Sequence, residues 1–298
     1  MIGEILRSGS VAPLALAAIA DPVEPGGSQH ETWYSDYREV LDSEVSAVII
    51  ATPPALHYSI ANQALRSGKD VYVEKPPARS AAEARQLART AKVNGRVLFF
   101  AYHARYNPAV PEARAFLEGA ELRGIEVRTK ENAGNFHSPH NWVREEGVLR
   151  DSGINVFSVL TELIPAAADL HIISRVFTAP AAGGSPTKAK IELNGRIHID
   201  MDWEYTGPEV RLFEILTGGG RCSIDLSRGV FLVNGIPRHS PEHKRPATRD
   251  VLRAEYEAML GDWSERLQSR ESCSSTREME LLDQAEAMPP PSGQPASN

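Results

Sequence analysis

The chain has 298 residues, 42% of them hydrophobic and 24% charged, which is ordinary for a globular protein and suggests two domains. A net charge of −7 argues against nucleic acid as the main partner. Two cysteines without metal or disulfide spacing, no apolar run long enough to span a membrane, and no signal-peptide pattern lead us to expect a cytoplasmic protein.

The first part of the chain, to about residue 102, alternates apolar runs with helical segments. The expected strands are 14–20, 45–51, 71–73 and 97–102, and the expected helices are 37–43, 56–67 and 80–93. Ser80 followed by Glu83 is a capping box, and Gly68 suits the end of the preceding helix. Short connections between alternating strands and helices predict a doubly wound parallel sheet, so residues 1–102 are expected to form a Rossmann-like domain.

The pattern changes after residue 102 to many β-like runs divided by turns. The expected strands are 125–130, 172–178, 188–193, 196–205, 210–216, 221–226 and 230–233, and the expected helices are 108–117, 152–163 and 249–268. Residues 132–146 look like a polar, aromatic loop. These runs predict an α+β domain, residues 103–288, with a largely antiparallel sheet, and a disordered tail at 289–298.

One stretch places a lysine where an open parallel sheet does its chemistry. Val71–Val73 forms a short β-branched and aromatic strand, Glu74 and Lys75 follow it, and two prolines then end the strand. Ligands of such sheets bind outside the carboxyl ends of the strands, so Lys75 is a catalytic candidate. A structural ion pair with its glutamate neighbour is the alternative.

Three segments together carry a resemblance to a known family: IATPPALH at 50–57, GKDVYVEKP at 68–76, and DSGIN at 151–155. They resemble the Gfo/Idh/MocA family of NAD(P)-dependent oxidoreductases over residues 10–285. The second proline after Lys75, HARY at 103–106 and Asn155 are similar to the branch of D-galactose and L-arabinose 1-dehydrogenases. The resemblance implies a Rossmann domain followed by an open-faced antiparallel sheet, through which a homodimer could form.

The resemblance also implies roles for particular side chains. Expected catalytic residues are Lys75, Asp151 and Asn155, expected sugar contacts are His103, Glu131 and Trp203, and expected cofactor contacts are Asp21, Thr52, Pro53, Pro54, His57, Glu74 and Lys75. A lysine with a lowered pKa can take up the alcohol proton. An acid at the strand end repels a 2′-phosphate, so Asp21 favours NAD, with NADP as the alternative.

Structural explanations stay open for several of these residues. Asp151 could simply cap the helix that follows it, and Trp203 could be a core residue. His137 and His140 have H-x-x-H spacing, but a metal site would need a third ligand on regular structure, so no metal is expected.

The chain departs from the family pattern at its start, where no G-x-G-x-x-G turn precedes the first expected strand. In the family that turn brings backbone N–H groups to the cofactor pyrophosphate. From the resemblance we expect oxidation of an aldose at C1 to the lactone. The departure from the family pattern keeps open the alternative of a catalytically inactive homologue that binds a sugar or protein partner. Inositol or dihydrodiol oxidation is a third reading, which Asn155 in place of a histidine disfavours.

Overall fold

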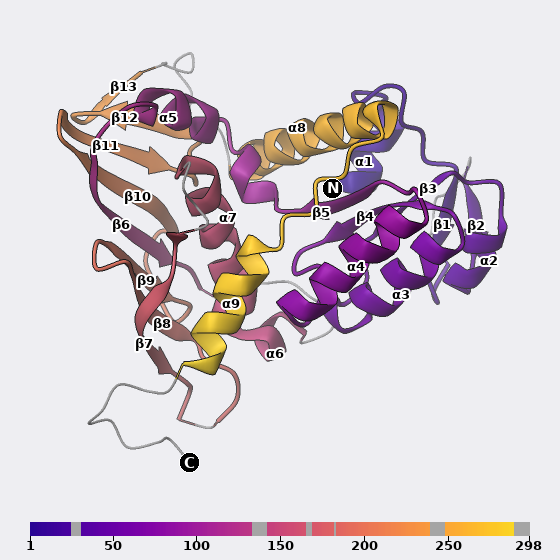
Figure 1. Ribbon diagram of the computed structural model, residues 1–298, viewed down its shortest axis with the longest axis horizontal. Helices are drawn as coiled ribbons and strands as arrows, with labels where there is room; N and C mark the ends of the chain where they lie inside the picture. The colour runs from indigo at the N-terminus through magenta and orange to yellow at the C-terminus, as the bar shows by residue number, and fades with distance from the viewer. Residues whose placement is uncertain (25–30, 133–141, 165–168, 182, 239–247, 289–298) are drawn as a thin grey trace. The chain divides into compact units, whose positions relative to one another are not determined.

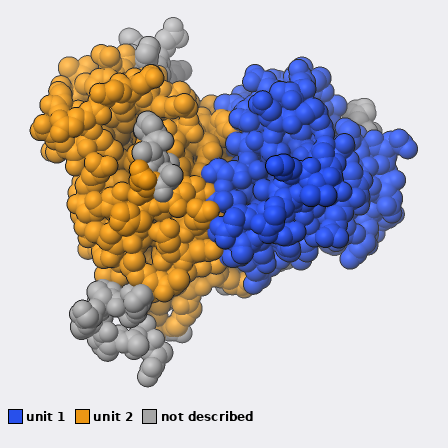
Figure 2. Space-filling view, in the orientation of Figure 1, with its two compact units in different colours: residues 1–101, 256–276 blue, residues 102–255, 277–298 orange. Residues whose placement is uncertain are grey.

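The computed structural model describes residues 1–24, 31–132, 142–164, 169–181, 183–238 and 248–288. The chain divides into two compact units, which Figure 2 colours separately. The first unit contains Met1–Ala101 and Tyr256–Thr276, and the second contains Tyr102–Glu255 and Arg277–Asn298. The first unit therefore takes a late segment of the chain in addition to the N-terminal part.

The first unit holds two small parallel sheets. Its strands are β1 (Ala18–Ala20), β2 (Thr32–Tyr34), β3 (Ala47–Ile50), β4 (Asp70–Glu74) and β5 (Leu98–Ala101). β1 pairs with β2, and β3, β4 and β5 pair in that order. The expected Rossmann-like parallel arrangement is confirmed, but the expected strand at 14–20 is regular only in its last three residues.

Helices cover both faces of the β3–β5 sheet. They are α1 (Ile2–Ser8), α2 (Tyr37–Asp42), α3 (Pro54–Arg66), α4 (Ala81–Val93) and the part of α8 (Thr248–Ser269) from Tyr256 onward. In Figure 1, α3 and α4 lie on one side of β3–β5, and α1 and α8 lie on the other. At α4 the Ser80 hydroxyl accepts the Glu83 N–H at 3.3 Å, as the expected capping box requires, but the Glu83 carboxylate accepts the N–H of Arg79 at 2.9 Å and not that of Ser80.

The core of the first unit is aromatic. The rings of Tyr72 and Phe99 stack with centroids 5.4 Å apart, and the Trp263 ring lies 5.3 Å from that of Tyr72. Arg270 forms two hydrogen bonds with the buried carboxylate of Asp70, at 2.6 and 3.0 Å. These contacts join the late segment to strands from much earlier in the chain, since Arg270 and Asp70 are 200 positions apart.

The second unit is built on one eight-stranded sheet in the order β13-β12-β11-β10-β6-β9-β8-β7. Its strands are β6 (Leu122–Lys130), β7 (Ile172–Thr178), β8 (Lys188–Leu193), β9 (Ile197–Asp202), β10 (Val210–Thr217), β11 (Gly220–Asp225), β12 (Val230–Val233) and β13 (Ile236–Pro237). The expectation of a mostly antiparallel sheet is confirmed; β6 and β9 form the parallel pair.

The remaining helices of the second unit lie against one face of this sheet (Figure 1). They are the 3₁₀ turn η1 (His103–Tyr106), α5 (Ala109–Leu117), α6 (Trp142–Val148), the π-helical turn η3 (Leu149–Gly153), α7 (Ile154–Leu163) and α9 (Arg277–Ala287). The sheet side chains alternate accordingly: Ile125, Val127 and Thr129 of β6 are buried, whereas Glu126 and Arg128 between them are exposed.

Three local features differ from the sequence expectations. The end of the expected 132–146 loop is helical from Trp142, and β2 and α9 were not anticipated at all. α9 was missed although its buried Met279 and Leu282 have helical spacing. In the described residues, no helix is long and apolar enough to cross a membrane.

Candidate active site

Lys75 follows the central strand of the three-stranded sheet. β4 is buried along its length up to Glu74, and Lys75 is half-buried immediately after it. The main-chain N–H of Lys75 donates to the Glu74 carboxylate at 3.2 Å, and the Lys75–Pro76 peptide bond is cis. The structure thus places this lysine at the carboxyl end of a parallel strand, as the sequence predicts.

His57 joins the two loops that flank this lysine. Its ring is 1% exposed, with Nδ1 2.8 Å from the carbonyl oxygen of Pro76 and Nε2 2.7 Å from that of Thr52. A carbonyl oxygen can only accept a hydrogen bond, so each of these two contacts is a hydrogen bond when the ring nitrogen involved carries a hydrogen atom. His57 therefore braces the segment after β3 against the segment that carries Lys75.

The other expected cofactor residues lie at carboxyl ends of strands in the same unit. Asp21 follows β1, is exposed, and accepts the Val23 N–H at 2.9 Å, while Pro53 and Pro54 open α3. The Thr52 hydroxyl after β3 is buried without a hydrogen-bond partner among the described residues. An exposed carboxylate for ribose hydroxyls and an orphaned buried hydroxyl fit a dinucleotide whose ribose and phosphate groups need both kinds of contact.

Asp151 and Asn155 lie one turn apart in the second unit. Asp151 is inside the π-helical turn η3, and Asn155 is in the first turn of α7, where its Nδ2 donates to the Asp151 carbonyl at 3.3 Å. Asp151 therefore does not cap α7, because the helical geometry already begins before it. The Asn155 Oδ1 is buried with no partner in the described part of the chain, so it is an acceptor available to a ligand hydroxyl.

Glu131 is the centre of a buried polar cluster beneath this turn. Its Oε2 accepts the Ser152 hydroxyl at 2.6 Å and the Trp203 indole N–H at 3.3 Å, and its Oε1 accepts two N–H groups of Arg211 at 2.9 and 2.7 Å. Burial would lower the pKa of Arg211, but the carboxylates of Glu131 and Glu209 outweigh it and raise that pKa. The cluster holds Ser152, and with it the turn carrying the adjacent aspartate.

Trp203 lies just past the end of β9 and is 2% exposed. Its indole also donates to the Ser152 hydroxyl at 2.9 Å. The sequence left a sugar contact and a core residue open for Trp203, and the structure adds that its indole N–H already donates to Glu131 and Ser152. A sugar contact through the ring face remains a prediction for Trp203 and, through its carboxylate, for Glu131.

His103 has a buried carboxylate partner that the sequence did not suggest. Its Nδ1 lies 2.7 Å from Oε2 of Glu255, whose Oε1 accepts the side-chain amide of Asn107 at 2.6 Å. All three residues are buried, at 6, 4 and 0% exposure. Such a carboxylate fixes the ring orientation and tautomer of a histidine, as in many catalytic and metal-binding sites.

The residues that sequence reasoning missed share one property. Arg211, Glu255 and Asn107 belong to no motif, and like Ser152 each becomes informative only through a partner elsewhere in the chain. Ser152 alone was within reach, because it lies inside the DSGIN segment. The described residues hold no group of three or more metal-ligating side chains, and His137 and His140 lie outside them.

Comparison with known proteins shows which proteins the chain as a whole resembles. Residues 14–102 match a family described as an oxidoreductase family with an NAD-binding Rossmann fold. Galactose 1-dehydrogenase of Pseudomonas fluorescens is 24% identical over 223 residues, 73% of this chain and 71% of that enzyme. A crystal structure of a D-galactose 1-dehydrogenase from Rhizobium etli is 26% identical, with a TM-score of 0.81 over 96% of this chain and 91% of that one.

A more distant solved structure, levoglucosan dehydrogenase in complex with NADH and levoglucosan, has the same fold. Its TM-score is 0.77 at 18% identity, over 96% of this chain and 92% of that one. The similarity therefore extends over both units, whereas the family match lies in the first.

Proposed function

Because this chain belongs, through residues 14–102, to the Gfo/Idh/MocA oxidoreductases, whose cofactor is NAD, we propose that it is an NAD-dependent sugar dehydrogenase acting on C1 of a galactose- or arabinose-like aldose. The observation that carries the substrate class is the unpartnered Asn155 Oδ1, which lies one helical turn after Asp151. A carboxylate and an amide one helical turn apart suit two neighbouring hydroxyl groups of a sugar.

Each residue then has a defined task. Lys75 assists removal of the proton of the C1 hydroxyl, and Asp151 and Asn155 hold neighbouring sugar hydroxyls. His103, oriented by Glu255, donates to or accepts from a further hydroxyl. NAD, when bound, would supply the hydride acceptor, so that an aldose giving up the C1 hydride and the hydroxyl proton would leave as the lactone. Asp21, Thr52 and Glu74 would hold the cofactor, and the carboxylate of Asp21 would favour NAD over NADP.

The decisive experiment is a matched lysine comparison. Isothermal calorimetry measures NAD and NADP binding, and NADH absorbance measures turnover of galactose, arabinose and inositol. Lys75→Met is expected to lower kcat by at least ~100-fold, since proton transfer contributes 10²–10⁴-fold in typical enzymes. Lys92→Met, on the exposed side of α4, is the control and should retain full activity. Equal activity of the two variants would contradict the mechanism.

An inactive sugar- or partner-binding homologue is the second candidate. It is favoured by the separation of β1 and β3 into different sheets in the part of the chain that the structure describes, since a dinucleotide binds along the edge of one continuous parallel sheet. A folded protein that binds galactose in calorimetry but neither binds NAD nor forms NADH would establish this candidate.

Self-association and location are part of the same proposal. The sheet face opposite α5, α7 and α9 has no helix over it among the described residues, and it carries ion pairs such as Arg128–Glu214 and Lys130–Asp200. A homodimer through this face would be polar, and light scattering should give twice the 32.6 kDa chain mass, with dissociation at high salt. Cysteine usage favours a cytoplasmic location.

A further inference from the structure

The turn that carries Asp151 is π-helical rather than α-helical. It is η3 (Leu149–Gly153), and the N–H of Ile154 bonds to the carbonyl of Leu149, five residues earlier. π-Helical turns are rare and occur mostly as single-turn insertions in α-helices, frequently at functional sites. A π turn holds about one residue more than an α turn, so it changes the direction in which the residues before it point relative to those after it. This turn therefore decides how Asp151 is oriented relative to Asn155.

Close packing against the sheet is one condition for this turn. A Cβ atom added at Gly153 would lie 2.9 Å from Cδ1 of Leu149 and 3.5 Å from Cε of Met201 on β9. Gly153 has an ordinary helical backbone, with φ −63° and ψ −39°, so its missing side chain matters here for space and not for conformation. The turn thus lies directly on the inward side of the sheet. Apolar packing has no direction, however, so it does not by itself select a π turn over an α turn.

Directional contacts to the turn come from Glu131 through Ser152. An ionised carboxylate offers about four lone-pair sites. Four donor groups of described residues converge on the carboxylate of Glu131: two N–H groups of Arg211 on Oε1, and the Ser152 hydroxyl and the shared Trp203 indole N–H on Oε2. The Ser152 hydroxyl donates its one hydrogen to Glu131 at 2.6 Å and accepts the Trp203 N–H at 2.9 Å, so it is fixed in both of its roles.

We propose that Ser152 is a positioning residue, through which Glu131 and Arg211 hold the π turn and so present Asp151 to the substrate. The proposal rests on the proposed function, in which Asp151 holds a sugar hydroxyl. Successive residues of a helical turn point roughly 90° apart, so Ser152, which is 6% exposed, can point into the cluster while the half-buried Asp151 points elsewhere. Because four donors already occupy the Glu131 carboxylate, a sugar hydroxyl could reach it only by displacing one of them.

Two other roles for the cluster predict different results. If the cluster only stabilises the fold, loss of the Ser152 hydroxyl lowers the free energy of unfolding but not the activity of the folded protein. If Glu131 contacts the sugar itself, loss of the Ser152 hydroxyl and loss of the Asp151 charge act independently, and their effects on activity multiply. If Ser152 acts through Asp151, loss of the hydroxyl matters only while that carboxylate is present.

The first measurement concerns the turn itself and needs no substrate. Amide hydrogen exchange is followed in the wild type, in Ser152→Ala and in the matched control Ser174→Ala. The control removes a hydroxyl that also donates to a carboxylate, that of Glu192 on β8, at 3.2 Å. Ser152→Ala should speed exchange at the Ile154 amide, which makes the π bond, at least ~10-fold relative to the Leu160 amide within α7, and Ser174→Ala should not. An unchanged Ile154 rate in Ser152→Ala would overturn the proposal.

The second measurement is a kinetic double-mutant cycle of Ser152→Ala with Asp151→Asn, followed by NADH absorbance. Ser152→Ala alone should lower kcat/KM for the aldose by at least ~10-fold, because a small displacement of a group that holds the substrate costs that much or more. In the Asp151→Asn background the same change should lower kcat/KM by less than about 2-fold, and Ser174→Ala should leave it within about 2-fold of the wild type. Equal effects of Ser152→Ala in the two backgrounds would overturn the proposal.

The two measurements separate the positioning of the turn from the proposed activity. A wild type that forms no NADH with any aldose contradicts the proposed function, and the Ile154 exchange rate still decides whether Ser152 holds the turn. An active enzyme whose kcat/KM is unchanged in Ser152→Ala leaves the cluster only a role in stability and overturns the positioning. Urea unfolding checks that each variant is folded in the assay. Ser152→Cys, whose thiol is a weak donor, is the milder variant and should give an intermediate exchange rate and kcat/KM.

Discussion

The Glu131–Arg211 pair offers the sharpest quantitative prediction. Glu131 is 5% exposed, and the Arg211 side chain is 30% exposed with two N–H groups on Oε1 of the glutamate. Breaking a buried pair by removing one partner typically destabilises a protein by about 3–5 kcal/mol. Because Arg211 is partly solvated, Arg211→Met is expected to lower the free energy of unfolding by about 2–3 kcal/mol.

A double-mutant cycle that combines Arg211→Met with Glu131→Gln separates the effect of charge from that of packing. Glu131→Gln keeps an acceptor for Ser152 and leaves a guanidinium that water can reach, so its expected cost is about 1–2 kcal/mol. With glutamine at 131, Arg211→Met no longer strands a buried charge, and the double variant should cost little more than Glu131→Gln alone. The coupling energy is therefore about 2 kcal/mol, measured by urea unfolding of all four proteins.

A surface pair on the same sheet provides the control. Arg128 and Glu214 form an ion pair on the opposite face, where their side chains are 47% and 33% exposed. The matched cycle Arg128→Met and Glu214→Gln should give a coupling below about 1 kcal/mol. If the Glu131–Arg211 effects add within about 0.5 kcal/mol, the carboxylate is not held by the arginine, and the reasoning about the turn that carries Asp151 fails.

Three further outcomes follow from the structure. Glu255→Gln keeps the shape beside His103 but removes the carboxylate charge. It should lower kcat/KM for the sugar by about 10-fold, measured by NADH absorbance, with NAD affinity unchanged. An unchanged kcat/KM would show that His103 needs no anionic partner. Arg270→Met should lower the free energy of unfolding by about 1–2 kcal/mol in urea, because it leaves the buried Asp70 carboxylate unpaired while Arg270 itself is 45% exposed; an effect below about 0.3 kcal/mol would contradict this. Burial raises the pKa of the Cys222 thiol to about 11. The native state therefore keeps the thiol proton to higher pH than the unfolded state does, and the free energy of unfolding falls as the pH rises from about 9 through 11. Cys222→Ala should remove on the order of 2 kcal/mol of that fall, measured by urea unfolding at pH 8 and pH 11.

Much of the architecture was readable from the sequence because its signals are local. Strand and helix periods, the capping box at Ser80, and the prolines after Lys75 each depend on residues within one or two turns. The pairing of Asp151 with Asn155 was also predicted from a spacing of four residues, and the structure places them one turn apart. These features need no knowledge of where the rest of the chain goes.

Other features could be decided only by the tertiary structure. A glutamate in a long helix reads as a solvated residue, yet Glu255 is buried against a histidine 152 positions earlier. Arg211 on β10 and Glu131, just past the end of β6, are likewise 80 positions apart in the chain. The late segment that includes Arg270 joins the first unit through Asp70. Sequence periodicity shows which face of an element is apolar, but not which distant element covers it.

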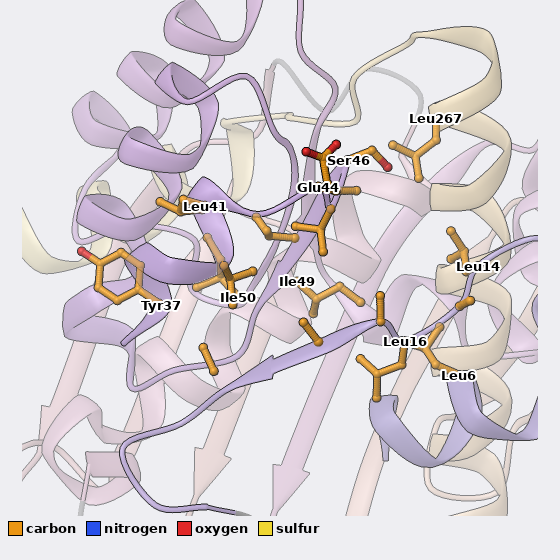
Figure 3. Close-up of a pocket in the computed structure, with 18 of the residues that line it drawn as sticks. Leu6, Leu14, Leu16, Tyr37, Leu41, Glu44, Ser46, Ile49, Ile50 and Leu267 are labelled. Carbon is orange, nitrogen blue, oxygen red and sulfur yellow. The ribbon is translucent and has the colours of Figure 1, made fainter. Parts of the chain in front are cut away.

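An apolar cavity lies between β1 and β3 (Figure 3) and belongs to the same class. The two strands could be predicted from the sequence, but whether they pair directly or leave a cavity between them depends on how α1, α2 and α8 pack around it. The physical reason is that local sequence determines the strands themselves, whereas hydrogen bonds across strand edges form only where the whole unit brings two edges within reach.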